Sequence, residues 1–272
     1  MVTETESTDS AHAVSRVGLD GLAIKPSECS LREVPRTLLE AVETVTVDYE
    51  GARHVPGPDT LCELGRHVDV RVTVPVRADG FDPLGVDEAA RSLPEAVGRV
   101  LVAGHPTYLE TAERKRAVAP RLGAALERWP NAWVGTEGLE RLAMATGATQ
   151  FDLLTGRSER ELRGLRAAGY DGRIAVYAPT VLTDDEDAIL DAVGAYVARR
   201  HPVSRTLPAD ATTDASVTGQ ARETLLDAAR EYALAGDIET VSSRIEALRE
   251  AGASTVVGYP ARGLETIASV GR

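Results

Sequence analysis

Three residues carry side chains that could move a proton or bond to a substrate, and each follows a short apolar run. His105, in AGHPTY, is the histidine placed to act as an acid or base near neutral pH. Lys25, one of only two lysines, could hold a phosphate or carboxylate, or form a Schiff base if desolvated. Glu137, at the end of AWVGTE, is a further proton-handling candidate. The alternatives are a capping or packing role for His105 and a surface ammonium for Lys25.

A four-residue segment has the composition of an anion-binding turn: Thr155, Gly156, Arg157 and Ser158. Backbone amides at the helix start that follows would suit an anion, together with the fork-shaped guanidinium of Arg157. Arg262 stands at another strand end, and two guanidinium groups could clamp one phosphate or carboxylate. The alternatives are an ordinary capping box that starts at Ser158, and pairing of both arginines with surface carboxylates.

Further polar side chains stand at other strand ends. Asp48 and Glu50 are two residues apart, so they face the same way. Paired carboxylates could bind a metal or act as acid and base, but no further ligand is evident, and a solvated rim is the favoured interpretation. Tyr177 and Tyr259 are candidate cofactor contacts. No metal site is predicted.

The elements that must position these residues are eight short apolar runs, which are typical of buried parallel strands. The runs are 17–25, 44–49, 68–76, 99–104, 132–137, 150–155, 173–179 and 254–259. Segments of helical character separate them, at 35–42, 59–65, 87–97, 108–129, 139–146, 159–168, 184–200, 220–235 and 238–251. This alternation favours parallel pairing through right-handed crossovers, and eight units predict a (β/α)8 TIM barrel.

The domain organisation follows from the same pattern. Residues 16–272 are expected to form the single barrel domain, and residues 1–15 a disordered tail. The stretch 201–218 is predicted to be a mobile loop, too polar and rich in proline to pack. A doubly wound sheet is the alternative, but the chain has neither G-x-G-x-x-G nor a P-loop sequence. Barrel active sites lie at the carboxyl ends of the strands, where the candidate residues stand.

The charge is strongly acidic, with a formal net charge of -12 and two lysines among 30 basic residues. Such a surface repels itself at low salt, and it is typical of a protein from the cytoplasm of a salt-loving, archaeal type of microbe. The acidity argues against nucleic acid as a partner, because phosphate binding needs a basic stripe. The chain has no apolar run long enough for a membrane span, and its start has no signal-peptide pattern. A cytoplasmic protein with a small-molecule substrate is expected, and a homodimer is the candidate assembly.

The C-terminal half resembles the luciferase-like flavin and deazaflavin oxidoreductases. From Val134 the chain reads VGTEGLERLAMATGATQFDLLTGRSERELRGLRAAGYDGRIAVYAPTVLTDD, with a glycine-containing strand end, a helix and a strand that carries an acidic residue. The stretch AGDIETVSSRIEALREAGASTVVGY is similar to the ending of that family. The matching positions are Gly236, Asp237, Arg244, Ile245, Leu248, Ala251, Gly252, Val256 and Val257. Among archaeal members, the methylenetetrahydromethanopterin reductase group, which uses the deazaflavin coenzyme F420, is the best comparison.

The N-terminal half departs from that family. Residues 97–105 (VGRVLVAGH) keep a Gly-Arg pair and a strand, but Gly104, His105 and Pro106 stand where the family has a glycine-rich turn. The loops are also shorter than in the family.

The resemblance implies an oxidoreductase that moves a hydride between F420 or FMN and a small organic substrate. Residues 155–158, Tyr177, Tyr259 and Arg262 would then contact the cofactor, and His105 or Glu137 would handle the proton. The alternatives are a non-redox lyase or isomerase of a small phosphorylated or carboxylated metabolite, using Lys25 or His105, and a degenerate barrel that only binds a ligand or partner.

Overall fold

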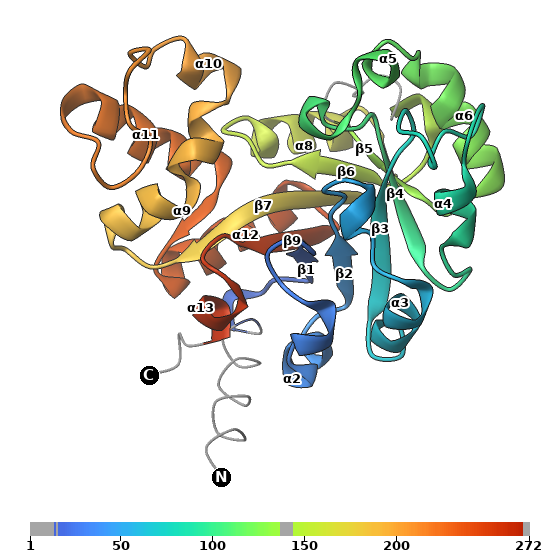
Figure 1. Ribbon diagram of the computed structural model, residues 1–272. Helices are drawn as coiled ribbons and strands as arrows, with labels where there is room; N and C mark the ends of the chain where they lie inside the picture. Colours follow the sequence, from blue (N-terminus) through green and yellow to red (C-terminus); the bar gives the residue numbers. More distant parts are fainter. Residues whose placement is uncertain (1–13, 15, 137–143, 269–272) are drawn as a thin grey trace.

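The computed structural model describes residues 14, 16–136 and 144–268, and eight of its strands pair in parallel into a closed barrel. The arrangement of the barrel can be followed in Figure 1. Each strand pairs in parallel with its neighbours in the order β1-β2-β3-β4-β5-β6-β7-β9, and β9 returns to β1. The strands are β1 Gly21–Ile24, β2 Thr44–Val47, β3 Asp69–Pro75, β4 Gly98–Val102, β5 Trp133–Gly135, β6 Gln150–Leu153, β7 Ile174–Leu182 and β9 Thr255–Pro260. The predicted TIM barrel is confirmed, with one strand inside each of the eight apolar runs or extending just beyond it.

A ninth strand was not predicted. Strand β8, Leu234–Gly236, pairs in parallel with the carboxyl end of β7 and lies outside the closed ring. It is only three residues long and comes directly after helix α11, Gly219–Tyr232, so the sequence pattern merges it into that helix.

Most of the predicted helices form, and proline residues explain why two of them have other bounds than expected. The helices of the first half are α2 Arg36–Glu40, α3 Pro58–Leu64, α4 Glu88–Ser92, α5 Thr111–Arg114 and α6 Val118–Arg128, with 3-10 turns η1 Leu31–Glu33, η2 Ala52–His54 and η3 Pro106–Tyr108. Helix α4 is shorter than expected because Leu93, which precedes Pro94, is extended. The expected helix at 108–129 is broken, and α6 restarts so that Pro120 lies in its first turn.

The second half adds α8 Ser158–Ala167, α9 Glu186–Ala198, α10 His201–Ser204, α12 Ile238–Ala251 and α13 Leu264–Ala268. The predicted helix at 139–146 lies in part outside the described residues. Helices α9, α10 and α11 form a lobe at one side of the barrel (Figure 1). None of the helices in the described part of the chain has the length and apolar character that a bilayer span requires.

The stretch 201–218 packs against this lobe, contrary to the expectation that it is too polar to do so. It begins with α10, and the side chains of Val203 and Val217 are buried with Leu190, Val197 and Leu225. A Cβ on Gly194 of α9 would stand 1.9 Å from the carbonyl oxygen of Thr213, so the glycine permits this close approach. Mobility of the segment stays a prediction.

The inside of the barrel holds its own cluster of buried side chains. Trp133, Phe151 and Tyr177 lie in sequence around the ring, with centroids 5.8 and 5.7 Å apart. At the amino end of the barrel, the Arg71 guanidinium lies 4.3 Å from the Trp133 ring and its Nε 2.8 Å from a carboxylate oxygen of Asp69. Side chains therefore fill the barrel at the amino ends of its strands, and the space that remains opens at the carboxyl ends.

Candidate functional site

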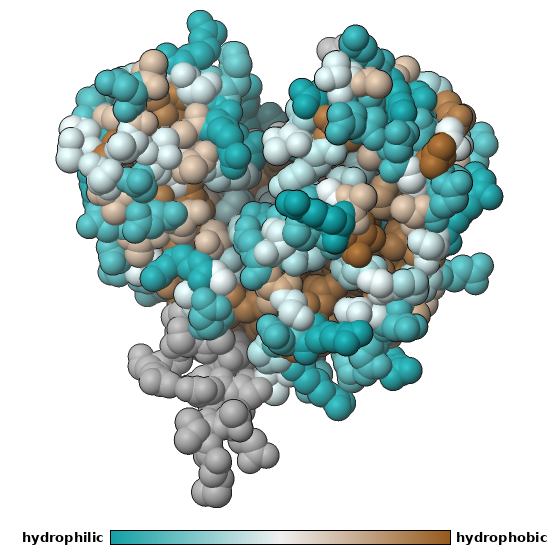
Figure 2. All heavy atoms as spheres, in the orientation of Figure 1, coloured by the Kyte–Doolittle hydropathy of each residue, from teal (hydrophilic) through white to brown (hydrophobic). Residues whose placement is uncertain are grey.

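A cavity of about 610 Å³ occupies the mouth of the barrel, at the end where TIM-barrel enzymes bind substrates. Its polar lining residues are Lys25, Asp48, Glu50, Thr73, Arg77, His105 and Thr136. Its apolar and aromatic lining residues include Tyr49, Pro75, Val102, Tyr108, Phe151, Leu153 and Tyr177. Figure 2 shows the molecular surface hollowed between the α9–α11 lobe and the part that carries α5 and α6.

Asp48 and Tyr177 form the central polar pair of this cavity. Asp48 directly follows β2, Tyr177 points inward from β7, and the Tyr177 hydroxyl donates to Oδ2 of Asp48 at 3.1 Å. Burial raises the pKa of Asp48 to about 7, although the positive charge of Lys25 and the hydrogen bond from Tyr177 act in the opposite direction. Burial and the neighbouring Asp48 carboxyl raise the pKa of the Tyr177 hydroxyl, which stays protonated and serves as a donor. Asp48 can therefore take up and release a proton near neutral pH.

The interpretation of Asp48 as part of a solvated rim was therefore wrong. Sequence spacing placed Asp48 and Glu50 on one side of the strand end, and both do line the cavity. The spacing gave no sign that Tyr177, 129 residues further along the chain, would donate to Asp48. Glu50 has a backbone partner, the amide of Ser27, at 2.9 Å.

Lys25 lines the same cavity, but its ammonium group already has neighbours. Its Nζ lies 3.3 Å from Oε1 of Glu28 and 3.7 Å from the centroid of the Tyr259 ring. The Tyr259 hydroxyl donates to Glu28. Burial is the larger cause that raises the pKa of Tyr259, and the Glu28 carboxylate adds to it. A carboxylate and an aromatic face both stabilise a charged ammonium, so this arrangement suits a positive charge better than a Schiff-base nucleophile.

His105 lies on the aromatic side of the mouth. Its Nδ1 accepts a hydrogen bond from the Thr107 amide at 3.2 Å and so caps the turn η3, as the capping alternative predicted. The ring lies 6.0 Å from that of Tyr108, which in turn lies 6.3 Å from Tyr49. Because Tyr108 is 40% exposed, its ring can contact a flat ligand bound at this wall.

The segment 155–158 uses its polar groups internally. The Thr155 amide donates to the Ser158 hydroxyl at 2.9 Å, and the Arg157 amide donates to the Thr155 hydroxyl at 3.1 Å. Ser158 is the first residue of α8 rather than its cap. A Cβ on Gly156 would stand 3.0 Å from the carboxyl carbon of Glu231, so a negatively charged side chain lies next to this turn.

The structure thus brings some of the predicted site residues together and separates others. Lys25, His105 and Tyr177 line one cavity. Residues 155–158, Tyr259 and Arg262 are not among its lining residues, and Arg262 is exposed in the turn after β9. Glu137 lies outside the described residues. The roles of all of these residues in binding and catalysis stay predictions.

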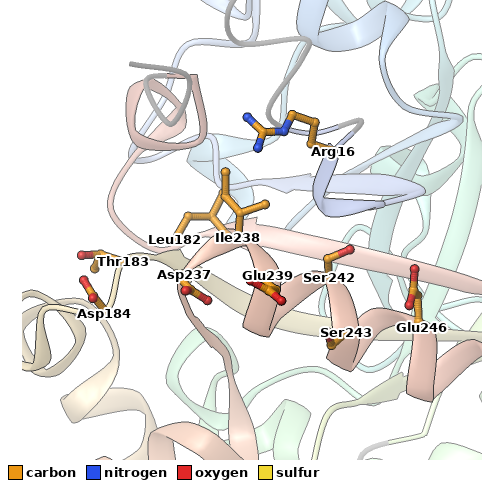
Figure 3. A pocket seen from close by; sticks show the side chains of 10 residues that line it. All are labelled: Arg16, Leu182, Thr183, Asp184, Asp237, Ile238, Glu239, Ser242, Ser243 and Glu246. Carbon is orange, nitrogen blue, oxygen red and sulfur yellow. The ribbon is translucent and has the colours of Figure 1, made fainter.

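A second hollow lies away from the mouth, along α12 (Figure 3). It is more open, and side chains of both signs surround it, including Arg16, Asp184, Glu239 and Glu246. Asp237 at its edge is the cap of α12, because its carboxylate accepts from the Thr240 amide at 2.8 Å. Among the described residues that line this hollow, no acid–base pair like that of Asp48 and Tyr177 is found.

Comparisons with known proteins agree with the fold. The model of DUF7388, a family of unknown function, matches residues 14–267. A comparison with curated protein sequences finds no match. A solved structure titled "F420-dependent secondary alcohol dehydrogenase in complex with an F420-acetone adduct" superposes with a TM-score of 0.59 at 14% identity, covering 92% of this chain and 97% of that one.

A gluconate 5-dehydrogenase from Burkholderia cenocepacia J2315, in complex with NADP and tartrate, gives a TM-score of only 0.27 at 16% identity, with 92% and 98% of the two chains covered. That score is too low to inform the fold. At 14% identity, the likeness to the alcohol dehydrogenase shows the barrel architecture and nothing finer.

Proposed function

The chain belongs to the DUF7388 family, and we propose that it is a luciferase-like oxidoreductase that moves a hydride between a deazaflavin (F420) or flavin and a small organic substrate. The observation that carries the proposal is the Asp48–Tyr177 pair, an acid–base group with a pKa near 7 inside an aromatic-walled cavity. The resemblance of the C-terminal half to the luciferase-like enzymes and the shared barrel of an F420-dependent alcohol dehydrogenase add support for the cofactor class.

The cavity fits the flat ring of such a cofactor. Its volume of about 610 Å³ lies within the usual range of ligand pockets, roughly 300–1,000 Å³. Val102, Phe151 and Leu153 would contact the ring, together with Tyr108 and His105. When bound, the ring would supply the hydride acceptor or donor. The predicted phosphate contacts at 155–158 fit less well, because that turn is already hydrogen-bonded to itself and faces Glu231.

The residues of the chain would supply the proton chemistry. Oxidation of an alcohol removes a hydride from carbon and a proton from the hydroxyl group, and ionised Asp48 would accept that proton. In the reverse direction, protonated Asp48 would donate a proton to the oxygen of the carbonyl substrate. The Tyr177 hydroxyl holds the Asp48 carboxylate in place, and the positive charge of Lys25 limits how far burial raises the pKa of Asp48.

A second function is favoured by the charges of the mouth: a cofactor-independent lyase or isomerase. Asp48 and Glu50 line the cavity together with Lys25 and His105, a set that could move a proton between two carbon atoms of a bound metabolite without any hydride acceptor. A cofactor with an anionic tail would have to avoid these carboxylates. The two functions differ in whether any turnover occurs without F420 or FMN.

Turnover assays separate the two functions. Purified protein is mixed with F420 or FMN and a panel of small alcohols and carbonyl compounds, and the visible absorbance of the cofactor is followed. The oxidoreductase proposal expects a bleaching or recovery that depends on both cofactor and substrate and is lost in Asp48→Asn. The isomerase alternative expects exchange of substrate C–H hydrogens with D2O, seen by NMR without cofactor. Exchange without any cofactor reaction would overturn the first proposal.

A further inference from the structure

Arg77 differs from the other charged residues of the mouth because backbone carbonyls, and not a carboxylate, hold its guanidinium. It follows β3, and its Nε and Nη2 donate to the successive carbonyls of Ala103 and Gly104 at 2.6 and 3.1 Å. Its Nη1 donates to the carbonyl of Arg114 at 3.0 Å. A guanidinium carries five N–H donors, so two have no acceptor among the described residues. The group is therefore fixed in orientation but not fully bonded.

The positive charge of Arg77 also has no counter-charge in the described part of the chain. Burial lowers the pKa of Arg77, and no neighbouring carboxylate offsets that effect. Lys25, in the same cavity, pairs with Glu28 at 3.3 Å. The chain has 42 acidic residues against 30 basic ones, yet none of the described carboxylates pairs with Arg77. A partly buried cation without a counter-charge is costly, unless a ligand supplies the negative charge.

We propose that Arg77 binds the carboxylate group of the substrate, so that the enzyme acts on a small organic acid that also carries a hydroxyl or carbonyl group. The inference rests on the proposed function, which assigns the proton of that second group to Asp48. Both residues line one cavity, so one small molecule can reach both. A guanidinium that keeps undonated N–H groups can bind the oxygens of a carboxylate through charge-assisted hydrogen bonds.

The charges of the cavity favour a monoanion over a phosphate dianion. Asp48 and Glu50 line the same space and repel negative charge, and Arg77 can compensate only one charge. A carboxylate places its single charge on the guanidinium and leaves the rest of the molecule neutral for the part of the cavity near Asp48. The predicted phosphate clamp of Arg157 and Arg262 would add nothing here, because neither residue lines this cavity.

Binding of matched small probes tests the assignment. Lactate and its uncharged amide, lactamide, differ in the carboxylate alone, and inorganic phosphate is the third probe. Dissociation constants are measured by calorimetry at constant ionic strength, with and without F420 or FMN, for the wild type, Arg77→Gln and Arg77→Lys. Arg166→Gln is the control, because Arg166 also clamps backbone carbonyls, those of Tyr170, Gly172 and Gly252, away from the cavity.

The wild type should bind lactate at least about tenfold more tightly than lactamide, since charged hydrogen bonds are the stronger ones. Arg77→Gln should weaken lactate binding by about ten- to a hundredfold and leave lactamide unchanged. Arg77→Lys should fall between, and Arg166→Gln should match the wild type. Circular dichroism checks folding. If Arg77→Gln does not fold, the preference for lactate in the wild type and its decrease in Arg77→Lys decide the matter.

Equal binding of lactate and lactamide by the wild type would overturn the inference. So would undiminished lactate binding by folded Arg77→Gln, or binding of phosphate alone. If lactate binding depends on Arg77 but neither F420 nor FMN binds, the proposed function fails and the carboxylate site stands. If a cofactor binds but lactate does not, only the carboxylate site fails.

Discussion

Replacing Asp48 by asparagine removes one titrating group while keeping the shape of the side chain, so its effects on stability and on rate can both be worked out. The folded chain holds the pKa of Asp48 at about 7, against 3.8 for the free side chain. This difference corresponds to about 4 kcal/mol at most. Water at the open mouth screens part of that cost, so an effect of about 2 kcal/mol is the working value.

The sign follows from proton binding. Between pH 3.8 and about 7 the folded state holds a proton on Asp48 that the unfolded state has released, so the wild type loses stability as pH rises through this window. Above pH 7 both states are ionised and the loss is complete. Asp48→Asn has no such loss. The variant should therefore match the wild type near pH 4 and exceed it by about 2 kcal/mol at pH 8 in urea unfolding at fixed salt.

The same substitution should remove the acid–base step, which typically contributes about a hundred- to ten-thousandfold to the rate. In the direction of alcohol oxidation, kcat/KM of the wild type should rise with pH to a plateau, with a midpoint near 7. Tyr177→Phe removes a hydrogen bond that lowers the pKa of Asp48, so this variant should move the midpoint to higher pH. If Asp48→Asn leaves both the pH dependence of stability and the rate profile of the wild type unchanged, the role given to Asp48 is refuted.

Two further predictions concern the surface and the lobe. Because the net charge is -12, the melting temperature should rise by many degrees from low salt to molar potassium chloride; an unchanged value would refute the salt-loving interpretation of the composition. Gly194→Ala should push the segment around Thr213 off α9 and make it the first site of limited proteolysis, whereas Gly164→Ala, whose Cβ would meet nothing within 4 Å, should leave the digest unchanged. Equal digests for the two variants would contradict the packing described for residues 201–218.

The barrel could be predicted from the sequence because its signal is local. Most strands are short, largely apolar runs such as GLAI at Gly21–Ile24, where all four residues are buried, and burial on both faces produces such runs. Strand β8 could not be found this way, because it has only three residues and follows closely after a helix. A segment of that length shows no hydrophobic periodicity of its own. The packing of residues 201–218 depends on two valines and one glycine contact. The polar composition of the whole segment does not reveal these three contacts.

The site was only partly predictable, because its chemistry depends on pairs that are far apart in the sequence. The rule that barrel sites lie at the strand ends placed Lys25, His105 and Tyr177 together. The rule did not distinguish these cavity residues from Arg262, which is exposed, or from the turn at 155–158, which is hydrogen-bonded internally. The pKa of Asp48 and the carbonyl cradle of Arg77 come from tertiary contacts. No residue spacing reports these contacts.

A titration of the purified protein with F420 and with FMN shows whether the mouth cavity binds a flavin-type ring. Leu153→Trp fills the cavity, and Ser242→Trp places the same bulk in the hollow along α12 as the matched control. We predict saturable quenching of the cofactor fluorescence by the wild type and Ser242→Trp, and its loss in folded Leu153→Trp. Failure of the wild type to bind either cofactor, or undiminished binding by Leu153→Trp, would contradict a cofactor site in the mouth cavity.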